Sequence, residues 1–111
     1  MTIEELQKQV IAFRDERNWK QFHNPKDVAL SLSLEASELL ENFQWKTRDE
    51  ALTISKEHIT DELADVVIYA LLFADEAQID LAKAVQQKIK KNALKYPVEK
   101  AKGNKSKYTE L

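Results

Sequence analysis

The scarcity of turn-forming residues is the feature that most restricts how this chain can fold. Its 111 residues contain one glycine and two prolines, whereas a protein made of many short strands needs such residues at most of its turns. The sequence therefore predicts an all-α protein with long helices and few connections. Because the connections are short, neighbouring helices should run antiparallel.

Capping signals and hydrophobic spacing locate the helices along the chain. Thr2 and Glu5 have the spacing of a capping box, and apolar residues recur at helical spacing from Ile3 to Phe13. The expected antiparallel bundle has four main helices and a short connector helix, at about residues 3–18, 25–43, 48–55 (the connector), 57–76 and 81–95.

The segment from Val66 to Ala74, VVIYALLFA, is apolar on all sides of its expected helix. A helix with this pattern is normally buried all round, and a monomer of this size has little material with which to cover it. We therefore expect oligomerisation to complete the bundle. The segment is too short to span a bilayer, and the N-terminal residues lack a signal-peptide pattern, so we expect a cytoplasmic protein without membrane contacts.

Charge is distributed unevenly along the chain. Residues 1–82 contain eight Lys or Arg against 17 Asp or Glu, whereas residues 83–107 contain nine lysines against Glu99. We expect residues 1–97 to form a single helical domain and residues 98–111 to form a lysine-rich tail. An acidic body with a basic end is typical of solvated helix faces, and it also suits a polyphosphate ligand that needs a divalent metal and ammonium groups.

Two pairs of acidic residues give the main functional signal. Glu35 and Glu38 lie three residues apart at the border of the apolar face of their helix, and Glu62 and Asp65 repeat the arrangement on another helix. On antiparallel helices the four carboxylates should meet, and they repel one another unless a cation neutralises them. All-oxygen ligands favour a hard cation, which we expect to be Mg²⁺, with Mn²⁺ or Ca²⁺ as the alternative.

Other interpretations are open at this point. A single E-x-x-E pair is typical of surface glutamates on amphipathic helices. A di-iron bundle would need E-x-x-H pairs, but neither His23 nor His58 lies three residues after a glutamate. A different class of protein is a non-enzymatic helical oligomerisation or nucleic-acid-binding module that uses the lysine-rich end. The acidic body argues against nucleic acid because it repels phosphates.

The acidic pattern and several longer stretches resemble a known family. Glu35-x-x-Glu38 followed by Glu62-x-x-Asp65 resembles the signature of the all-α nucleoside triphosphate pyrophosphohydrolases, the MazG-like group. The stretches RNWKQFHNP, EASELLENFQWK, DELADVVIYALL and KSKYTEL resemble its dCTP pyrophosphatase branch. The resemblance covers nearly the whole chain.

This resemblance implies a Mg²⁺-dependent enzyme that hydrolyses a nucleoside triphosphate, dCTP or a modified dCTP, to the monophosphate and pyrophosphate in nucleotide-pool house-cleaning. The alternative substrate is dUTP or another non-standard nucleotide. The resemblance also implies that residues 1–97 form a catalytic domain that assembles as a homodimer or homotetramer. Glu35, Glu38, Glu62 and Asp65 would be the metal ligands. Glu38, together with Glu35, would be catalytic by orienting or deprotonating the attacking water.

The same resemblance implies residues that contact the substrate. They are Trp19, His23 and Trp45 for the base, and Lys88, Asn92 and Tyr96 for the phosphates, the sugar and closure over the nucleotide. Lys105 and Lys107 in the tail are further candidates for phosphate contacts. The simpler interpretation makes the tryptophans packing residues and Lys88 a solvated lysine. Val10 stands where the branch offers a polar side chain, so base selectivity is expected to differ from a strict preference for dCTP.

Overall fold

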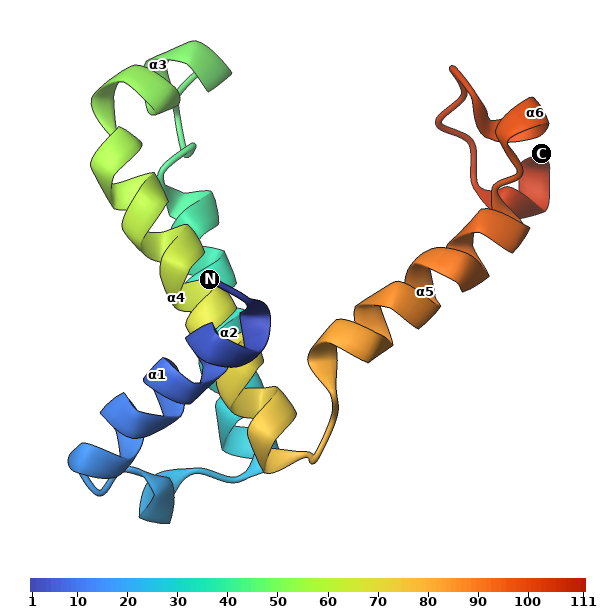
Figure 1. The fold of residues 1–111 in the computed structure, drawn as a ribbon. Coiled ribbons are helices and arrows are strands. Elements are labelled where there is room, and N and C mark those ends of the chain that lie inside the picture. The colour runs from blue at the N-terminus through green and yellow to red at the C-terminus, as the bar shows by residue number, and fades with distance from the viewer. The chain divides into compact units, whose positions relative to one another are not determined.

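The computed structural model describes residues 1–111, and its regular structure is entirely helical (Figure 1). The α-helices are α1 (Ile3–Glu16), α2 (Pro25–Glu41), α3 (Arg48–Ile54), α4 (Lys56–Glu76), α5 (Leu81–Lys95) and α6 (Val98–Ala101), and the 3-10 helices are η1 (Lys20–Phe22) and η2 (Tyr108–Glu110). The predicted all-α class is confirmed, and the ends of the five expected helices agree with the structure to within two residues. None of the helices has the length and hydrophobicity that a membrane span requires.

Side-chain caps explain where the main helices begin. Thr2 and Glu5 form a complete capping box at the start of α1, as the sequence predicts. Asn24, Thr47 and Asp80 each accept a hydrogen bond from a backbone N–H in the first turn of α2, α3 and α5, respectively. These contacts satisfy donors that the helix itself leaves free, which is why short local patterns locate the helices well.

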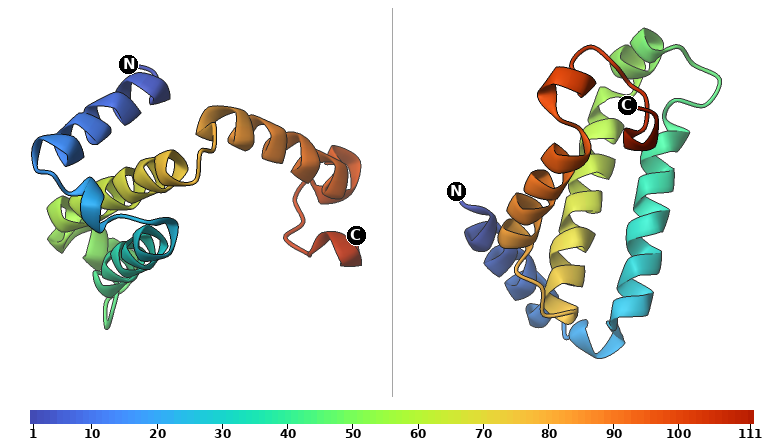
Figure 2. Two further views of the ribbon diagram at one scale, coloured as in Figure 1. Left: turned by 90° about the horizontal axis from the view of Figure 1, so that it is seen from below. Right: turned by 90° about the vertical axis from the view of Figure 1, so that its right-hand side faces the viewer.

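The chain divides into two compact units, Met1–Ile79 and Asp80–Leu111. In the first unit α2 and α4 run antiparallel and form the most extensive helix–helix contact, and α1 packs on α4 (Figures 1 and 2). The connector α3 lies between the end of α2 and the start of α4. This antiparallel pair is the part of the fold that positions the acidic residues.

The second unit contains α5, α6 and η2. The ring of Tyr108 packs edge-on against that of Tyr96, with the ring centroids 6.0 Å apart, and the Lys95 ammonium lies 4.9 Å from the Tyr108 centroid. The segment expected as a tail, 98–111, therefore folds back on the end of α5. The expected domain of residues 1–97 stays a prediction.

The core of the first unit is small. Its buried apolar residues are Val28, Ala51, Leu71, Leu72 and Ala74. The single chain does not cover the centre of α4 on every side, since Val67 is 41% exposed, and Leu63 before it is 52% exposed. Leu30, Leu34 and Leu40 of α2 are exposed as well. The helices α1, α2 and α3 of the same unit leave part of α4 exposed, as the sequence leads us to expect. The predicted association of copies stays a prediction.

Candidate active site

Three carboxylates from two helices converge in the first unit. Glu35 of α2 and Glu62 and Asp65 of α4 each place a carboxylate oxygen within 4.8 Å of the other two. The spacing of three residues puts Glu62 and Asp65 on one face of α4, and the packing of α2 against α4 brings Glu35 opposite them. We refer to these three residues as the carboxylate cluster.

Glu38, the fourth acidic residue of the predicted set, lies at the edge of the carboxylate cluster. It is exposed, and it interacts with the carboxyl groups of both Glu35 and Glu62. The sequence predicts Glu38 at the border of the apolar face, and in the single chain its side chain is exposed. Glu38 is therefore beside the cluster and open to water.

The carboxylate cluster contains more negative charge than its surroundings neutralise. Glu35 is half-buried, and its Oε2 atom has no hydrogen-bond partner. Burial, aided by the neighbouring carboxyl groups, raises the pKa of Glu35 to about 7. A hydrogen bond with Glu38, and then partial burial, raises the pKa of Glu62. None of the ion pairs in the structure reaches these groups.

These residues fit a hard divalent cation. Mg²⁺ and Ca²⁺ bind oxygen at about 2.0–2.6 Å, so that ligands of one ion are at most about 4–5 Å apart. The 4.8 Å limit on the three oxygens agrees with that separation. A cation would also relieve the repulsion within the cluster and give the unpartnered oxygen of Glu35 a partner. The all-oxygen donor set favours Mg²⁺ or Mn²⁺ over softer metals.

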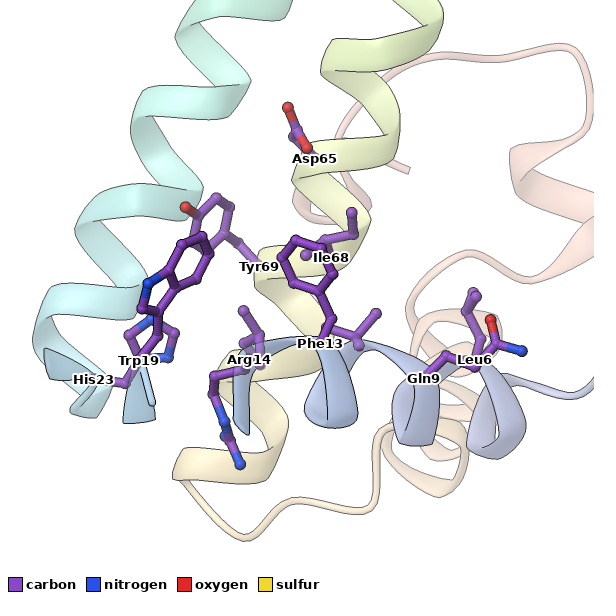
Figure 3. Close-up of a pocket in the computed structure, with 11 residues that line it drawn as sticks. Leu6, Gln9, Phe13, Arg14, Trp19, His23, Asp65, Ile68 and Tyr69 are labelled. Atoms are coloured by element: carbon purple, nitrogen blue, oxygen red, sulfur yellow. The ribbon is translucent and has the colours of Figure 1, made fainter. Parts of the chain in front are cut away.

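A cavity of about 400 Å³ lies against α1 and α4 and reaches the carboxylate cluster. Its wall is mainly aromatic and apolar, with Phe13, Trp19, Ile68, Tyr69 and Leu72 among the lining residues. Figure 3 shows Trp19, His23 and Tyr69 together at one end and Leu6 and Gln9 at the other. Asp65 belongs both to this wall and to the carboxylate cluster. The two features are therefore parts of one site.

The chain reaches the cavity after α1 through a sharp turn. Asn18 has a φ of 54°, in the left-handed region that asparagine tolerates better than most residues. The Trp19 N–H then donates to the Arg14 carbonyl at 3.1 Å. The Trp19 ring packs edge-on against Phe13 with the centroids 5.8 Å apart, and the Arg17 guanidinium lies 3.6 Å from the Phe13 centroid. We refer to Phe13 and Trp19 as the aromatic wall.

His23 and Tyr69 provide polar groups in the mainly apolar cavity. The Nδ1 atom of His23 is buried without a hydrogen-bond partner. Burial, followed by the charge of nearby carboxylates with Glu35 first, raises the pKa of Tyr69. Since buried polar atoms are normally paired, the free atom of His23 indicates a place where a ligand can form a hydrogen bond. An apolar cavity with a few such groups is typical of small-molecule sites.

Four other predicted substrate contacts are exposed. Trp45 follows α2 with a φ of 62° and is 93% exposed, so it does not line the cavity of its own chain. Lys88 and Asn92 lie on α5 in the second unit, and Tyr96 ends that helix against Tyr108. The binding roles of these four residues stay predictions.

Gln9, Phe13 and Arg14 line the cavity without having been predicted from the sequence. A signal for Phe13 was available, because it lies three residues after Val10 and so shares its helix face. Gln9 has no pattern that separates it from the other polar residues of α1. Arg14 looks like an ordinary surface arginine in the sequence, yet it is 2% exposed.

Comparison with known proteins agrees with the fold and identifies a family. The model of the MazG-like family matches residues 30–111. The chain is 37% identical to dCTP pyrophosphatase 1 of Homo sapiens and 38% identical to that of Mus musculus over 115 residues, which is 99% of this chain and 68% of each relative. A solved pyrophosphatase from Archaeoglobus fulgidus has the same fold, with a TM-score of 0.79 and 44% identity over 86% of this chain and 92% of that one.

An all-α fold with an acidic cluster beside an aromatic cavity, and relatives that are pyrophosphatases, define the chain as an enzyme of the pyrophosphatase class. The chain belongs to the MazG-like family. The resemblance found in the sequence and the expected class of enzyme are thereby confirmed.

Divalent metal should raise the melting temperature of the purified protein. A cation that binds only the folded state at one hundred times its Kd stabilises that state by about 3 kcal/mol, which corresponds to on the order of 10 °C for a chain of this size. Thermal unfolding in Mg²⁺ and in a chelator would measure the shift. An equal shift with sodium at matched ionic strength would contradict a specific site.

Proposed function

We propose that this protein hydrolyses a nucleoside triphosphate to the monophosphate and pyrophosphate, in a reaction that needs a divalent cation. The observation that carries the proposal is the position of Asp65, which belongs both to the carboxylate cluster and to the aromatic cavity. A triphosphate held at the cluster would therefore have its base directed into the cavity. A volume of about 400 Å³ is within the range of small-molecule sites, and aromatic faces suit the stacking of any base.

The proposed substrate is a deoxycytidine-type nucleotide, dCTP or a modified dCTP, and the proposed role is house-cleaning of the nucleotide pool. The relatives named dCTP pyrophosphatase 1 support this choice, since they align with 99% of the chain. Val10 lines the cavity where the dCTP branch offers a polar group, so dUTP or another non-standard nucleotide is the alternative. The non-enzymatic module has no observation of this structure in its favour.

The residues of the site have separate tasks in this proposal. Glu35, Glu62 and Asp65 would hold the cation, which when bound neutralises phosphate oxygens and lowers the pKa of a bound water. Glu38 is exposed beside the cluster, where it orients the attacking water and accepts its proton. The water oxygen attacks the α-phosphorus, the bond to the oxygen that bridges to the β-phosphorus breaks, and pyrophosphate leaves. Trp19 holds the base.

The proposal includes association of the chain as a homodimer or homotetramer. Leu34 and Leu63 are 64% and 52% exposed on α2 and α4, and large exposed apolar patches are typical of interfaces. Trp45, at 93% exposure, would line a base pocket only as part of a neighbouring copy. Lys88 and Asn92 would contact the phosphates and sugar and Tyr96 would close over the nucleotide, as the family resemblance implies. The cytoplasmic location expected from the sequence also stays a prediction.

A nucleotide panel tests the proposed function. Purified protein with Mg²⁺ is given each ribonucleoside and deoxyribonucleoside triphosphate, and pyrophosphate and orthophosphate are quantified separately. Equal amounts of monophosphate and pyrophosphate, formed fastest from dCTP, are expected. No turnover of any nucleotide by folded protein would refute the proposal and favour the non-enzymatic module.

Trp19→Ala should weaken substrate binding more than it slows the chemical step. Base–aromatic stacking contributes about 1–3 kcal/mol per base, so KM should rise about 5- to 150-fold while kcat changes little. Steady-state kinetics on dCTP would measure both constants. Phe22→Ala is the matched control, because Phe22 is a nearby aromatic residue that is 67% exposed and does not line the cavity. Equal effects of the two substitutions would contradict a stacking role for Trp19.

A further inference from the structure

Arg14 is a buried charged residue that the proposed reaction does not use. Its guanidinium lies in the last turn of α1, where Nη1 donates to Asp75 Oδ2 at 2.8 Å and lies 3.5 Å from Glu76 Oε1. Its Nε atom donates to Asp15 Oδ1 at 2.9 Å. Asp75 and Glu76 end α4. These ion pairs therefore tie the C-terminal end of α1 to the C-terminal end of α4.

The backbone of the same residue supports the aromatic wall. The Arg14 carbonyl accepts the N–H groups of Trp19 at 3.1 Å and Arg17 at 3.2 Å, and Phe13 is its chain neighbour. In Figure 3 the guanidinium extends away from the cavity, toward the end of α4, while the rings of Phe13 and Trp19 lie along the cavity. The side chain thus anchors the turn of the chain whose backbone holds Trp19.

Removal of the Arg14 side chain would leave the carboxylates around it without a partner. One guanidinium faces three carboxylates, and the side chains of Asp75 and Glu76 are only 27% and 11% exposed. Without Arg14 these two adjacent acidic groups would be left partly buried and unpaired, which is strongly unfavourable. They would be expected to move toward solvent, and the end of α1 would lose its attachment to α4.

We propose that Arg14 is a positioning residue for the nucleotide base, acting through the aromatic wall. The inference rests on the proposed function and deepens it, because it names the residue that holds the aromatic wall in position. The carboxylate cluster is built by α2 and α4 alone. Loosening α1 should therefore weaken binding of the base and leave the chemical step intact, which separates this role from a catalytic one.

Kinetics of two substitutions test the proposal against a matched control. Arg14→Gln should raise KM for dCTP about tenfold, with kcat unchanged within about twofold. The KM of Arg14→Lys should lie between those of Arg14→Gln and the wild type, since lysine retains the charge but lacks the planar set of donors. The control is Arg48→Gln. Arg48 makes the same contact with its following residue, Nε to Asp49 Oδ1 at 3.1 Å, but its side chain is 81% exposed, and no change is expected.

A second measurement does not depend on turnover. In protein carrying Trp45→Phe, Trp19 is the only tryptophan, and Arg14→Gln should raise the acrylamide quenching of its fluorescence in folded protein. Unchanged KM and unchanged quenching, or a loss of kcat without a change in KM, would overturn the proposal. If Arg14→Gln fails to fold, Arg14→Lys carries the same comparison. Absence of turnover in the wild type would refute the proposed function instead, and the quenching would still show whether Arg14 holds Trp19.

Discussion

Replacing Glu35 with glutamine should abolish turnover and leave the chain folded. The substitution keeps the shape of the side chain but removes one of the three carboxylates that converge within 4.8 Å and that we propose hold the cation. Losing even an outer hydrogen-bond partner of a metal ligand costs about 10- to 100-fold in activity, so loss of a ligand should lower kcat/KM by about 10³-fold or more. In the absence of metal the variant should melt at a higher temperature than the wild type, because one of several repelling, partly buried carboxylates is gone.

Two further glutamates on α2 make this experiment specific. Glu38→Gln should also abolish turnover, since it removes the proposed acceptor of the water proton. Glu41→Gln should change little, because Glu41 is exposed on the same helix and does not belong to the carboxylate cluster. Steady-state rates and melting curves of the three variants would be compared. Near-normal activity of Glu35→Gln would mean that the site is misplaced, and a large loss at Glu41 would mean that the face of α2 is misassigned.

Leu71→Ala should destabilise the protein by about 2–5 kcal/mol, the range for leucines truncated in a packed core. Leu71 is 1% exposed in α4, and its carbonyl accepts a hydrogen bond from Gln7 Nε2 of α1 at 3.0 Å. It therefore lies where the two helices that line the cavity meet. Because the core of this unit is small, the loss should be a large fraction of the total free energy of unfolding.

Chemical denaturation of the metal-free protein would measure this loss from the change in midpoint at constant slope. Leu94→Ala is the control, because Leu94 is 83% exposed in the chain and such substitutions usually change stability by less than about 0.5 kcal/mol. Equal losses for the two variants would show that burial in this structure does not describe the packing in solution.

The helices and the carboxylate cluster could be predicted from the sequence because they depend on local signals. The capping residues Thr2 and Asp80 mark helix starts without reference to the rest of the fold. The spacing of Glu62 and Asp65 fixes a shared face, and the connector between this helix and the helix of Glu35 suits an antiparallel pair. These two features were enough to predict that the three carboxylates lie close together.

The cavity wall on α1 could not be predicted in the same way, because it depends on how α1 lies against α4. The buried ion pair of Arg14 with Asp75 joins residues 61 positions apart, and no local pattern indicates that contact. The position of Trp19 depends on the left-handed conformation of Asn18, which many asparagines do not adopt. Trp45 and Leu63 raise a different problem, since periodicity identifies an apolar position but does not say whether the same chain or another copy covers it.

Hydrolysis in water enriched in ¹⁸O is the most direct test that this site cleaves nucleoside triphosphates at the α-phosphorus. The protein, Mg²⁺ and dCTP are incubated, and the label is located in the products by mass spectrometry, with Glu62→Gln as the control for the carboxylate cluster. We expect one ¹⁸O atom in the monophosphate, unlabelled pyrophosphate, and no reaction when Mg²⁺ is removed or Glu62 is replaced. Label in pyrophosphate, release of orthophosphate, or full activity of the Glu62→Gln variant would contradict the proposed site and reaction.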